Sequence, residues 1–263
     1  MSDNKLDQKA FLIDSTGFVL KYWFSMPAIK TKEHESISAF LGFCNFVIKF
    51  LKTYKPLYLS FAFDESLGTC FRNKIYPDYK RSREKAPKEL KIQFKLCREF
   101  LNLLGISNMA SKEYEADDIL YTLSKNNREK KLNNIIITND KDLYQIVHEG
   151  DLWWDFAEKK YTQKDLIEKL GFLPQKLPDY FGLMGDAVDG IPGAPGIGNK
   201  TASALMIQYK NLDNILMCVD TIPLKLGERY KRFIKIIEDN KKIIYLSKKL
   251  ATLEYIDSLN KNI

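Results

Sequence analysis

Residues 10–14 read AFLID, four apolar residues followed by an acid. A short apolar run of this kind predicts a strand that is buried on both faces. A carboxylate, Asp14, follows the run at its C-terminal end. A second apolar run, Leu57–Phe63, ends in the same way at Asp64. One acid at a strand end is often only a turn residue or a helix cap, so the inference depends on how often the pattern recurs.

The pattern recurs at Ile135–Thr138, an apolar run that is followed by Asp140 and Asp142. Between these strands, apolar residues repeat at helical spacing over Ser36–Lys52, with Ser36 as the expected N-cap. Strands that alternate with helices predict an α/β fold with a mostly parallel central sheet and helices on both faces. Further patterns predict helices over 90–104 (closed by Gly105), 115–123, 163–170 (capped by Thr162) and 178–184, a hairpin over 151–161, and a helical region after residue 200.

Nine acids stand at or near the predicted strand ends and in two short clusters. In open α/β sheets the functional site lies at the C-terminal ends of the strands, so these acids should meet there. Glu115 and Asp118 are three residues apart on one predicted helix, and Asp186 and Asp189 have the same spacing in a Gly-rich setting. The full set is Asp14, Asp64, Glu115, Asp117, Asp118, Asp140, Asp142, Asp186 and Asp189.

So many carboxylates in one cleft repel each other unless cations lie between them. The chain has only two histidines, and its four cysteines form no CxxC pair, which excludes a His-rich metal site and argues against a zinc ribbon. Oxygen ligands alone favour a hard ion, Mg²⁺ or Mn²⁺. Two such ions can activate a water and stabilise both oxygens of a phosphoryl displacement, so the acids predict phosphodiester hydrolysis.

The charge balance favours a polyanionic partner. The chain has 41 basic and 34 acidic residues, a net charge of +7, and only 25 acids remain when the nine are set aside. Basic side chains and tyrosines interleave between Phe71 and Lys88, where Pro77 and Pro87 interrupt regular structure. This composition is typical of a segment that faces nucleic acid, although a solvated loop would have the same pattern.

The bulk properties indicate an ordered soluble protein. No apolar run approaches the roughly 18 residues that span a bilayer, and residues 1–9 lack the basic-then-apolar layout of a signal peptide. We expect a monomer in the cytoplasm with no membrane partner.

Taken in order, the motifs resemble the 5′ nucleases of the flap endonuclease superfamily, especially the 5′→3′ exonuclease domain at the front of bacterial DNA polymerase I. The resemblance covers roughly residues 10–250. It is carried by LID at 12–14, FAFD at 61–64, FR at 71–72, YKRSR at 79–83, YEADDIL at 114–120, TNDKDL at 138–143, GD at 185–186, IPGAPGIG at 191–198 and TA at 201–202.

The resemblance implies a structure-specific enzyme that cuts DNA at 5′ ends and 5′ flaps in replication and repair. It implies one metal ion among Asp14, Asp64, Glu115, Asp117 and Asp118, and a second set of ligands at Asp140, Asp142, Asp186 and Asp189.

It also assigns the basic segment, about residues 70–90, to the helical arch of the family. Lys80 and Arg83 match the basic pair that grips the scissile phosphate and stabilises charge in the transition state. We expect Arg72 and Tyr79 to contact DNA from the same segment.

Ile191–Ala204 resembles the helix–two turns–helix element with which the family holds duplex DNA behind the cut, together with a potassium ion. Glycines let a backbone approach phosphate closely, and the amides at the start of the next helix can bind it. The residues expected to do so are Gly193, Gly196, Gly198, Lys200 and Thr201. The alternative is a plain Gly/Pro connecting loop.

The expected organisation is an α/β nuclease domain over 1–180, with the acidic site and the arch, and a helical DNA-binding region over 181–263 packed on the same body. Three places depart from the family pattern without removing a carboxylate: Gly190 for the usual Asn, Asn139 for Gly, and Ala187–Val188 for two serines. Two other functions are the alternatives to this nuclease. One is a catalytically silent module that binds branched DNA, which would be expected to lack some of the acids. The other is a PIN-type ribonuclease, which lacks the Gly/Pro element.

Overall fold

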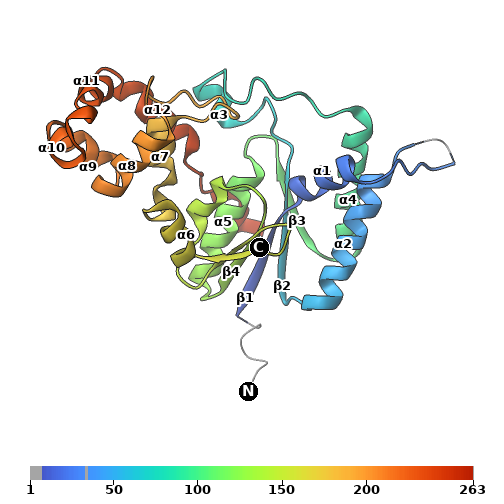
Figure 1. Ribbon diagram of the computed structural model, residues 1–263. Helices are drawn as coiled ribbons and strands as arrows, with labels where there is room; N and C mark the ends of the chain where they lie inside the picture. Colours follow the sequence, from blue (N-terminus) through green and yellow to red (C-terminus); the bar gives the residue numbers. More distant parts are fainter. Residues whose placement is uncertain (1–7, 33–34, 263) are drawn as a thin grey trace.

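The computed structural model describes residues 8–32 and 35–262. Its centre is a six-stranded sheet in the order β3-β2-β1-β4-β5-β6 (Figure 1). Neighbouring strands are parallel except β6, which runs antiparallel to β5. The strands are β1 (Lys9–Asp14), β2 (Tyr58–Asp64), β3 (Ser107–Ser111), β4 (Asn133–Ile137), β5 (Leu152–Trp154) and β6 (Lys160–Thr162). The predicted α/β fold is confirmed.

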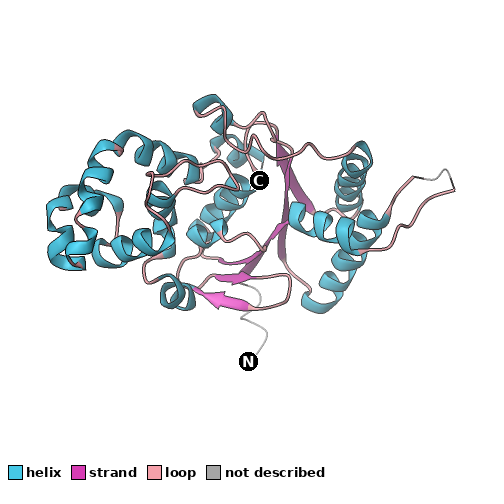
Figure 2. Ribbon diagram, turned by 45° about the horizontal axis from the view of Figure 1, so that its top comes forward, coloured by secondary structure: helices cyan, strands magenta, loops and turns pink. Residues whose placement is uncertain are grey.

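Helices cover both faces of the sheet, and a helical lobe lies beside it (Figures 1 and 2). The helices of the first half are α1 (Ser15–Ser25), α2 (Ser38–Tyr54), α3 (Phe71–Ile75), α4 (Lys88–Leu103), α5 (Ala116–Glu129) and the 3-10 helix η2 (Asp142–Ile146). Those of the second half are α6 (Gln163–Leu170), η3 (Pro174–Lys176), α7 (Leu177–Met184), α8 (Asn199–Tyr209), α9 (Leu212–Met217), η4 (Val219–Thr221), α10 (Ile222–Leu226), η5 (Glu228–Tyr230), α11 (Arg232–Asp239), α12 (Lys241–Ala251) and η6 (Asp257–Asn262). Within the described chain, no helix has the length and apolar character needed to cross a membrane.

Alternate residues of the central strands enter two different cores. Phe11 and Ile13 of β1 pack in the core formed with α1, α2 and α4, whereas Leu12 packs in the core that contains α5. The AFLID run is apolar without interruption because both faces of β1 are covered. The second core continues through the C-terminal helices as far as Ile256, so these helices share their interior with the sheet.

Short sequence patterns predicted most of the helices and strands, with some exceptions. Thr162 caps α6 as expected, since its side chain accepts a hydrogen bond from the amide of Asp165. Ser36 is not the N-cap of α2, which begins at Ser38 after an Ile37 that makes no side-chain cap. The helix α1 and the strand β3 were not predicted, and the sequence of β3, SNMAS, has no apolar run because it is a half-buried edge strand. Between Phe71 and Pro87 only α3 is helical, and the rest of the expected arch consists of turns and extended chain.

The chain after α12 returns to α5 through a buried ion pair. Arg72, which is 1% exposed, donates to both oxygens of Asp118 at 2.7 Å. Arg72 also donates to the carbonyls of Leu250 and Thr252, both at 2.8 Å. The amide of Glu254 donates to Asp118 as well. The pair therefore fastens the C-terminal segment to the first turn of α5.

We predict that Asp118→Asn lowers the free energy of unfolding by about 3 kcal/mol, because the buried Arg72 charge then loses its bidentate counter-ion and keeps only the single contact with Glu115. The free energy of unfolding is measured by urea denaturation of both proteins in the presence of a metal chelator. The matched control is Glu113→Gln, which breaks an ion pair with Lys74 between exposed side chains and should cost at most about 0.5 kcal/mol. Equal effects of the two substitutions would contradict the assignment.

Candidate active site

The strand-end acids meet at one edge of the sheet, as predicted. β1 lies between β2 and β4, so Asp14 stands between the ends of its two neighbours. The hydroxyl of Thr138, just after β4, donates to Asp14 at 2.9 Å and joins two of these ends directly. The pKa of Asp14 is raised to about 6 by burial and by the charges of Asp140 and Asp64, although the bond from Thr138 opposes this.

The clustered acids lie in the same place. Burial raises the pKa of Asp117 well above its ordinary value, and the charges of Asp140 and Asp14 add to the effect. Burial and the charges of Asp140, Asp189 and Asp186 raise the pKa of Asp142 to about 8. Charges act on each other this strongly only at short range, so the site gathers acids from five separate stretches of the chain.

The nine acids divide into two groups by their ion pairs. Three have basic partners: Glu115, Asp118 and Asp189. The other six form no ion pair with any residue that the structure describes: Asp14, Asp64, Asp117, Asp140, Asp142 and Asp186. Basic side chains of the protein neutralise the first group, whereas the second group has no such partner in the described chain.

Asp118 differs from the other acids in its hydrogen bonds. Its carboxylate is fully buried and accepts four of them, two from Arg72 and one each from the amides of Glu115 and Glu254. These four bonds use the lone pairs of the carboxylate. In this structure Asp118 therefore holds Arg72, and its role as a metal ligand stays a prediction.

Arg72 and Tyr79 are corrected, because both side chains are buried rather than presented to DNA. The hydroxyl of Tyr79 donates to Glu115 at 2.8 Å, and Arg72 donates to the same carboxylate at 3.0 Å. Burial alone would raise the pKa of Glu115, but Lys80 and Arg72 outweigh it and hold that pKa below its ordinary value.

Lys80 and Arg83 contact the acids directly, and their predicted contact with DNA phosphate stays a prediction. The ammonium of Lys80 lies 2.5 Å from Glu115 and 3.4 Å from Asp189, and Arg83 lies 2.5 Å from Asp189. The side chain of Lys80 is 9% exposed, whereas that of Arg83 is 40% exposed. Both cations therefore bridge the basic segment to the acidic edge.

The Gly/Pro loop before α8 is only partly as expected. Gly193 is buried, its amide donates to Ser247 at 2.9 Å, and a β-carbon there would lie 2.3 Å from the amide nitrogen of Gly185. Gly193 thus closes the loop on α12 and does not face phosphate. Gly196, Gly198 and Lys200 are exposed around the start of α8, while Thr201 is half-buried. Those three exposed residues can meet a ligand.

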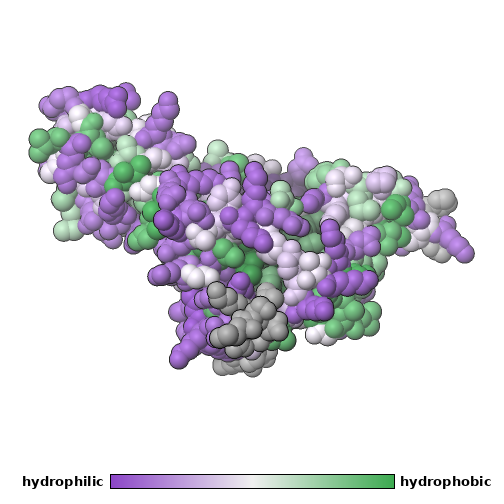
Figure 3. All heavy atoms as spheres, turned by 60° about the horizontal axis from the view of Figure 1, so that its bottom comes forward, coloured by the Kyte–Doolittle hydropathy of each residue, from purple (hydrophilic) through white to green (hydrophobic). Residues whose placement is uncertain are grey.

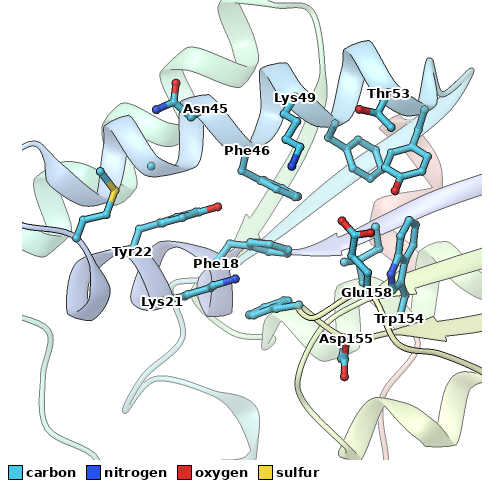
Figure 4. A pocket seen from close by; sticks show the side chains of 16 residues that line it. Phe18, Lys21, Tyr22, Asn45, Phe46, Lys49, Thr53, Trp154, Asp155 and Glu158 are labelled. Carbon is cyan, nitrogen blue, oxygen red and sulfur yellow. The ribbon is translucent and has the colours of Figure 1, made fainter.

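The carboxylates are close, but the space among them is filled. The hollow between Lys80 and the acids has a volume of about 10 Å³, and no group of three or more His, Cys, Asp or Glu within residues 8–32 and 35–262 is arranged to hold a metal ion. A larger cavity of about 600 Å³ lies elsewhere, between α1, α2 and the β5–β6 turn (Figure 4). Aromatic side chains such as Phe18, Phe46 and Trp154 line it, and it contains none of the predicted site residues. Seen from the side of the strands' N-terminal ends, hydrophilic side chains predominate on the helical lobe (Figure 3).

Comparison with known proteins places the chain in a family. Two family models match in succession, the N-terminal resolvase-like domain of 5′-3′ exonucleases over residues 9–171 and their C-terminal SAM fold over residues 172–261. A 5′-3′ exonuclease of Aquifex aeolicus is 37% identical over 207 residues, which are 78% of this chain and 71% of that protein. DNA polymerase I of Bacillus subtilis is 32% identical over 94% of this chain, but this chain spans only 28% of the polymerase.

Solved structures share the fold at low identity. A T5 5′-exonuclease with bound zinc ions superposes with a TM-score of 0.72 at 19% identity, covering 93% of this chain and 89% of that one. The catalytic core of Rad2 in complex with a DNA substrate gives 0.57 at 19% identity, covering 90% and 72%. The strand order, the acidic edge and the two successive family models agree: this chain belongs to the 5′-3′ exonuclease family.

Proposed function

We propose that this chain is a nuclease that uses Mg²⁺ or Mn²⁺ to hydrolyse phosphodiester bonds at 5′ ends and 5′ flaps of DNA. The observation that carries the proposal is the group of six acids without ion-pair partners in the described chain, gathered at the sheet edge where Lys80 and Arg83 also lie. The name of the related 5′-3′ exonuclease supports a 5′ nuclease activity. The polymerase activity of the longer relatives is not transferred, since this chain spans less than a third of their length.

The donor set fits hard divalent ions. All six unpaired acids offer carboxylate oxygens, and burial with mutual repulsion raises the pKa of Asp14, Asp117 and Asp142 in the metal-free protein. A cation of charge two relieves that repulsion, and oxygen donors favour Mg²⁺ or Mn²⁺. Glu115 and Asp189 complete the set of ligands. When bound, two such ions supply an activated water and stabilise charge on the attacking and leaving oxygens.

Three of the acids are held in the same local way. The backbone amide two residues further on donates to one carboxylate oxygen of Asp64, Asp140 and Asp186, at 2.8–2.9 Å. In each case the second oxygen accepts no hydrogen bond from the described chain. Turns of this kind fix the orientation of the carboxylate and leave one oxygen for a ligand.

Lys80 and Arg83 act on the phosphate. A cation aimed at the scissile phosphate stabilises charge that develops in the transition state, and a guanidinium can donate two parallel hydrogen bonds to phosphate. The duplex is held by the exposed start of α8, where Gly196, Gly198 and Lys200 surround free helix amides. A potassium ion at this loop stays a prediction.

The direct test uses a 5′-flap DNA labelled at its 5′ end. We expect the purified protein to release labelled product with Mg²⁺ or Mn²⁺ and to be inactive in excess chelator. Asp140→Ala should lose several orders of magnitude in rate, because it removes a metal ligand, but should keep its DNA affinity. Glu113→Gln, an exposed acid outside the site, is the control. Cleavage by the chelated protein, or at a normal rate by Asp140→Ala, would overturn the proposal.

The raised pKa values predict how stability depends on pH. Asp14 and Asp142 have pKa values of about 6 and 8 in the folded protein and an ordinary value of 3.8, so between those values the folded state binds more protons than the unfolded state. The free energy of unfolding of the metal-free protein should therefore fall as pH rises from about 4 to about 8. Saturating Mn²⁺ should abolish this fall, as thermal melts at several pH values can show.

The control for that measurement is Asp142→Asn, which removes the group with the higher pKa. Its metal-free protein should lose less stability between pH 6 and pH 8 than the wild type. Comparing the same protein with and without Mn²⁺ cancels titrations outside the site. A stabilisation by Mn²⁺ that is equal at pH 5 and pH 8 would contradict the assignment of these acids to the metal site.

The duplex-holding role of α8 predicts a change in salt dependence. Lys200→Ala should remove one phosphate contact, so the slope of log affinity against log salt should flatten by roughly 0.9 for duplex DNA. Lys210→Ala is the matched control, since it removes a lysine from the other end of the same helix. If both variants bind duplex like the wild type at every salt concentration, the DNA is held elsewhere.

A further inference from the structure

The ammonium of Lys80 occupies a position between two acids that the proposed function needs. It lies 2.5 Å from Glu115 and 3.4 Å from Asp189, whose side chains are 7% and 10% exposed. Arg83 makes a second contact with Asp189 at 2.5 Å. The protein thus supplies its own positive charge at the part of the acidic site where the sequence predicts divalent ions.

The space left beside Lys80 is too small for an ion with its water. The hollow lined by Lys80, Glu115, Asp117, Asp142 and Asp189 has a volume of about 10 Å³, roughly the room of one water molecule. Mg²⁺ usually keeps several waters when it binds to proteins. An ion that uses Glu115 and Asp189 must therefore take the place of the Lys80 ammonium.

The backbone brings Lys80 into this position through a close contact of two turns. The amide of Lys80 donates to the carbonyl of Asp189 at 2.8 Å, and Lys80 has a positive φ of 52°, which a lysine rarely adopts. Gly190 permits the contact, because a β-carbon at that residue would lie 2.7 Å from the carbonyl oxygen of Asp78. The side chain of Lys80 can leave the acids while this backbone contact stays.

We propose that Lys80 and Arg83 are exchangeable counter-ions of the metal site. Without metal they neutralise Glu115 and Asp189; divalent ions displace them from these carboxylates and release their charges toward the DNA phosphate. This inference rests on the proposed metal-dependent function. The proposed exchange couples the two binding events. A divalent ion that displaces Lys80 and Arg83 makes them available to the DNA phosphate, so each of the two ligands strengthens binding of the other.

The first test measures displacement directly, without DNA or catalysis. The protein is treated briefly with an amine-acylating reagent in chelator or in Ca²⁺, and the modified lysines are quantified by mass spectrometry. Lys80 should be protected in chelator and modified several-fold faster with Ca²⁺, whereas exposed Lys85 in the same segment should not change. Equal or slower modification of Lys80 with Ca²⁺ would overturn the proposal.

The second test measures competition for the carboxylates. Lys80→Met keeps the length of the side chain without its charge and should bind Mn²⁺ about tenfold more tightly by calorimetry. Lys141→Met removes an exposed lysine that stands between Asp140 and Asp142 in sequence, so it reports the general effect of one lost charge near the site. A gain for Lys80→Met no larger than that for Lys141→Met would overturn the proposal. Lys80→Arg restores the charge and should return the affinity toward that of the wild type.

Cleavage of the flap substrate is measured separately, so the two ideas can fail independently. If Mn²⁺ binds and displaces Lys80 but no DNA is cut, the exchange stands and the nuclease function fails. If the flap is cut in a metal-dependent way while Lys80 stays protected in Ca²⁺ and Mg²⁺, the function stands and the exchange fails.

Discussion

Repulsion among nine carboxylates at one edge of a parallel sheet is the constraint on which the rest of the structure depends. β1 lies between β2 and β4, so the acids at the strand ends cannot separate without breaking the sheet. Burial at this edge, together with the charges of Asp140, Asp189 and Asp186, raises the pKa of Asp142 to about 8. The fold neutralises part of this charge with Arg72, Lys80 and Arg83, and in the proposed function divalent ions would neutralise the rest.

The division between structural and functional acids is clearest at Asp117 and Asp118. Successive residues of a helix point about 100° apart, so neighbours in sequence face different surroundings. Asp118 points to Arg72 and the C-terminal segment, whereas Asp117 lies within the electrostatic reach of Asp14 and Asp140. The same turn of α5 thus holds one acid at the proposed metal site and, through Arg72, fastens the C-terminal segment.

The sequence predicted what local rules control. Apolar runs that end in acids located β1, β2 and β4, and Thr162 was recognisable as a cap from its own position. The sequence could not predict which acids form ion pairs with basic side chains. Asp117 and Asp118 are chemically alike, and only the position of Arg72 distinguishes them. The burial of Arg72 depends in turn on the carbonyls of Leu250 and Thr252, 178 and 180 residues away. Gly193 was misjudged for the same reason, since its partner Ser247 lies 54 residues away.

The acids also differ in how much rearrangement a metal ion would require of them. Asp64, Asp140 and Asp186 are fixed by amides two residues away, so they lose little side-chain entropy when they bind an ion. Glu115 and Asp189 must first give up Lys80 and Arg83. In the proposed site, local turns would set the geometry of the carboxylates, while the three ion pairs of Lys80 and Arg83 would lower their affinity for metal. Under the proposed exchange, DNA phosphate would stabilise the cations that the metal releases, so metal and DNA would favour each other's binding.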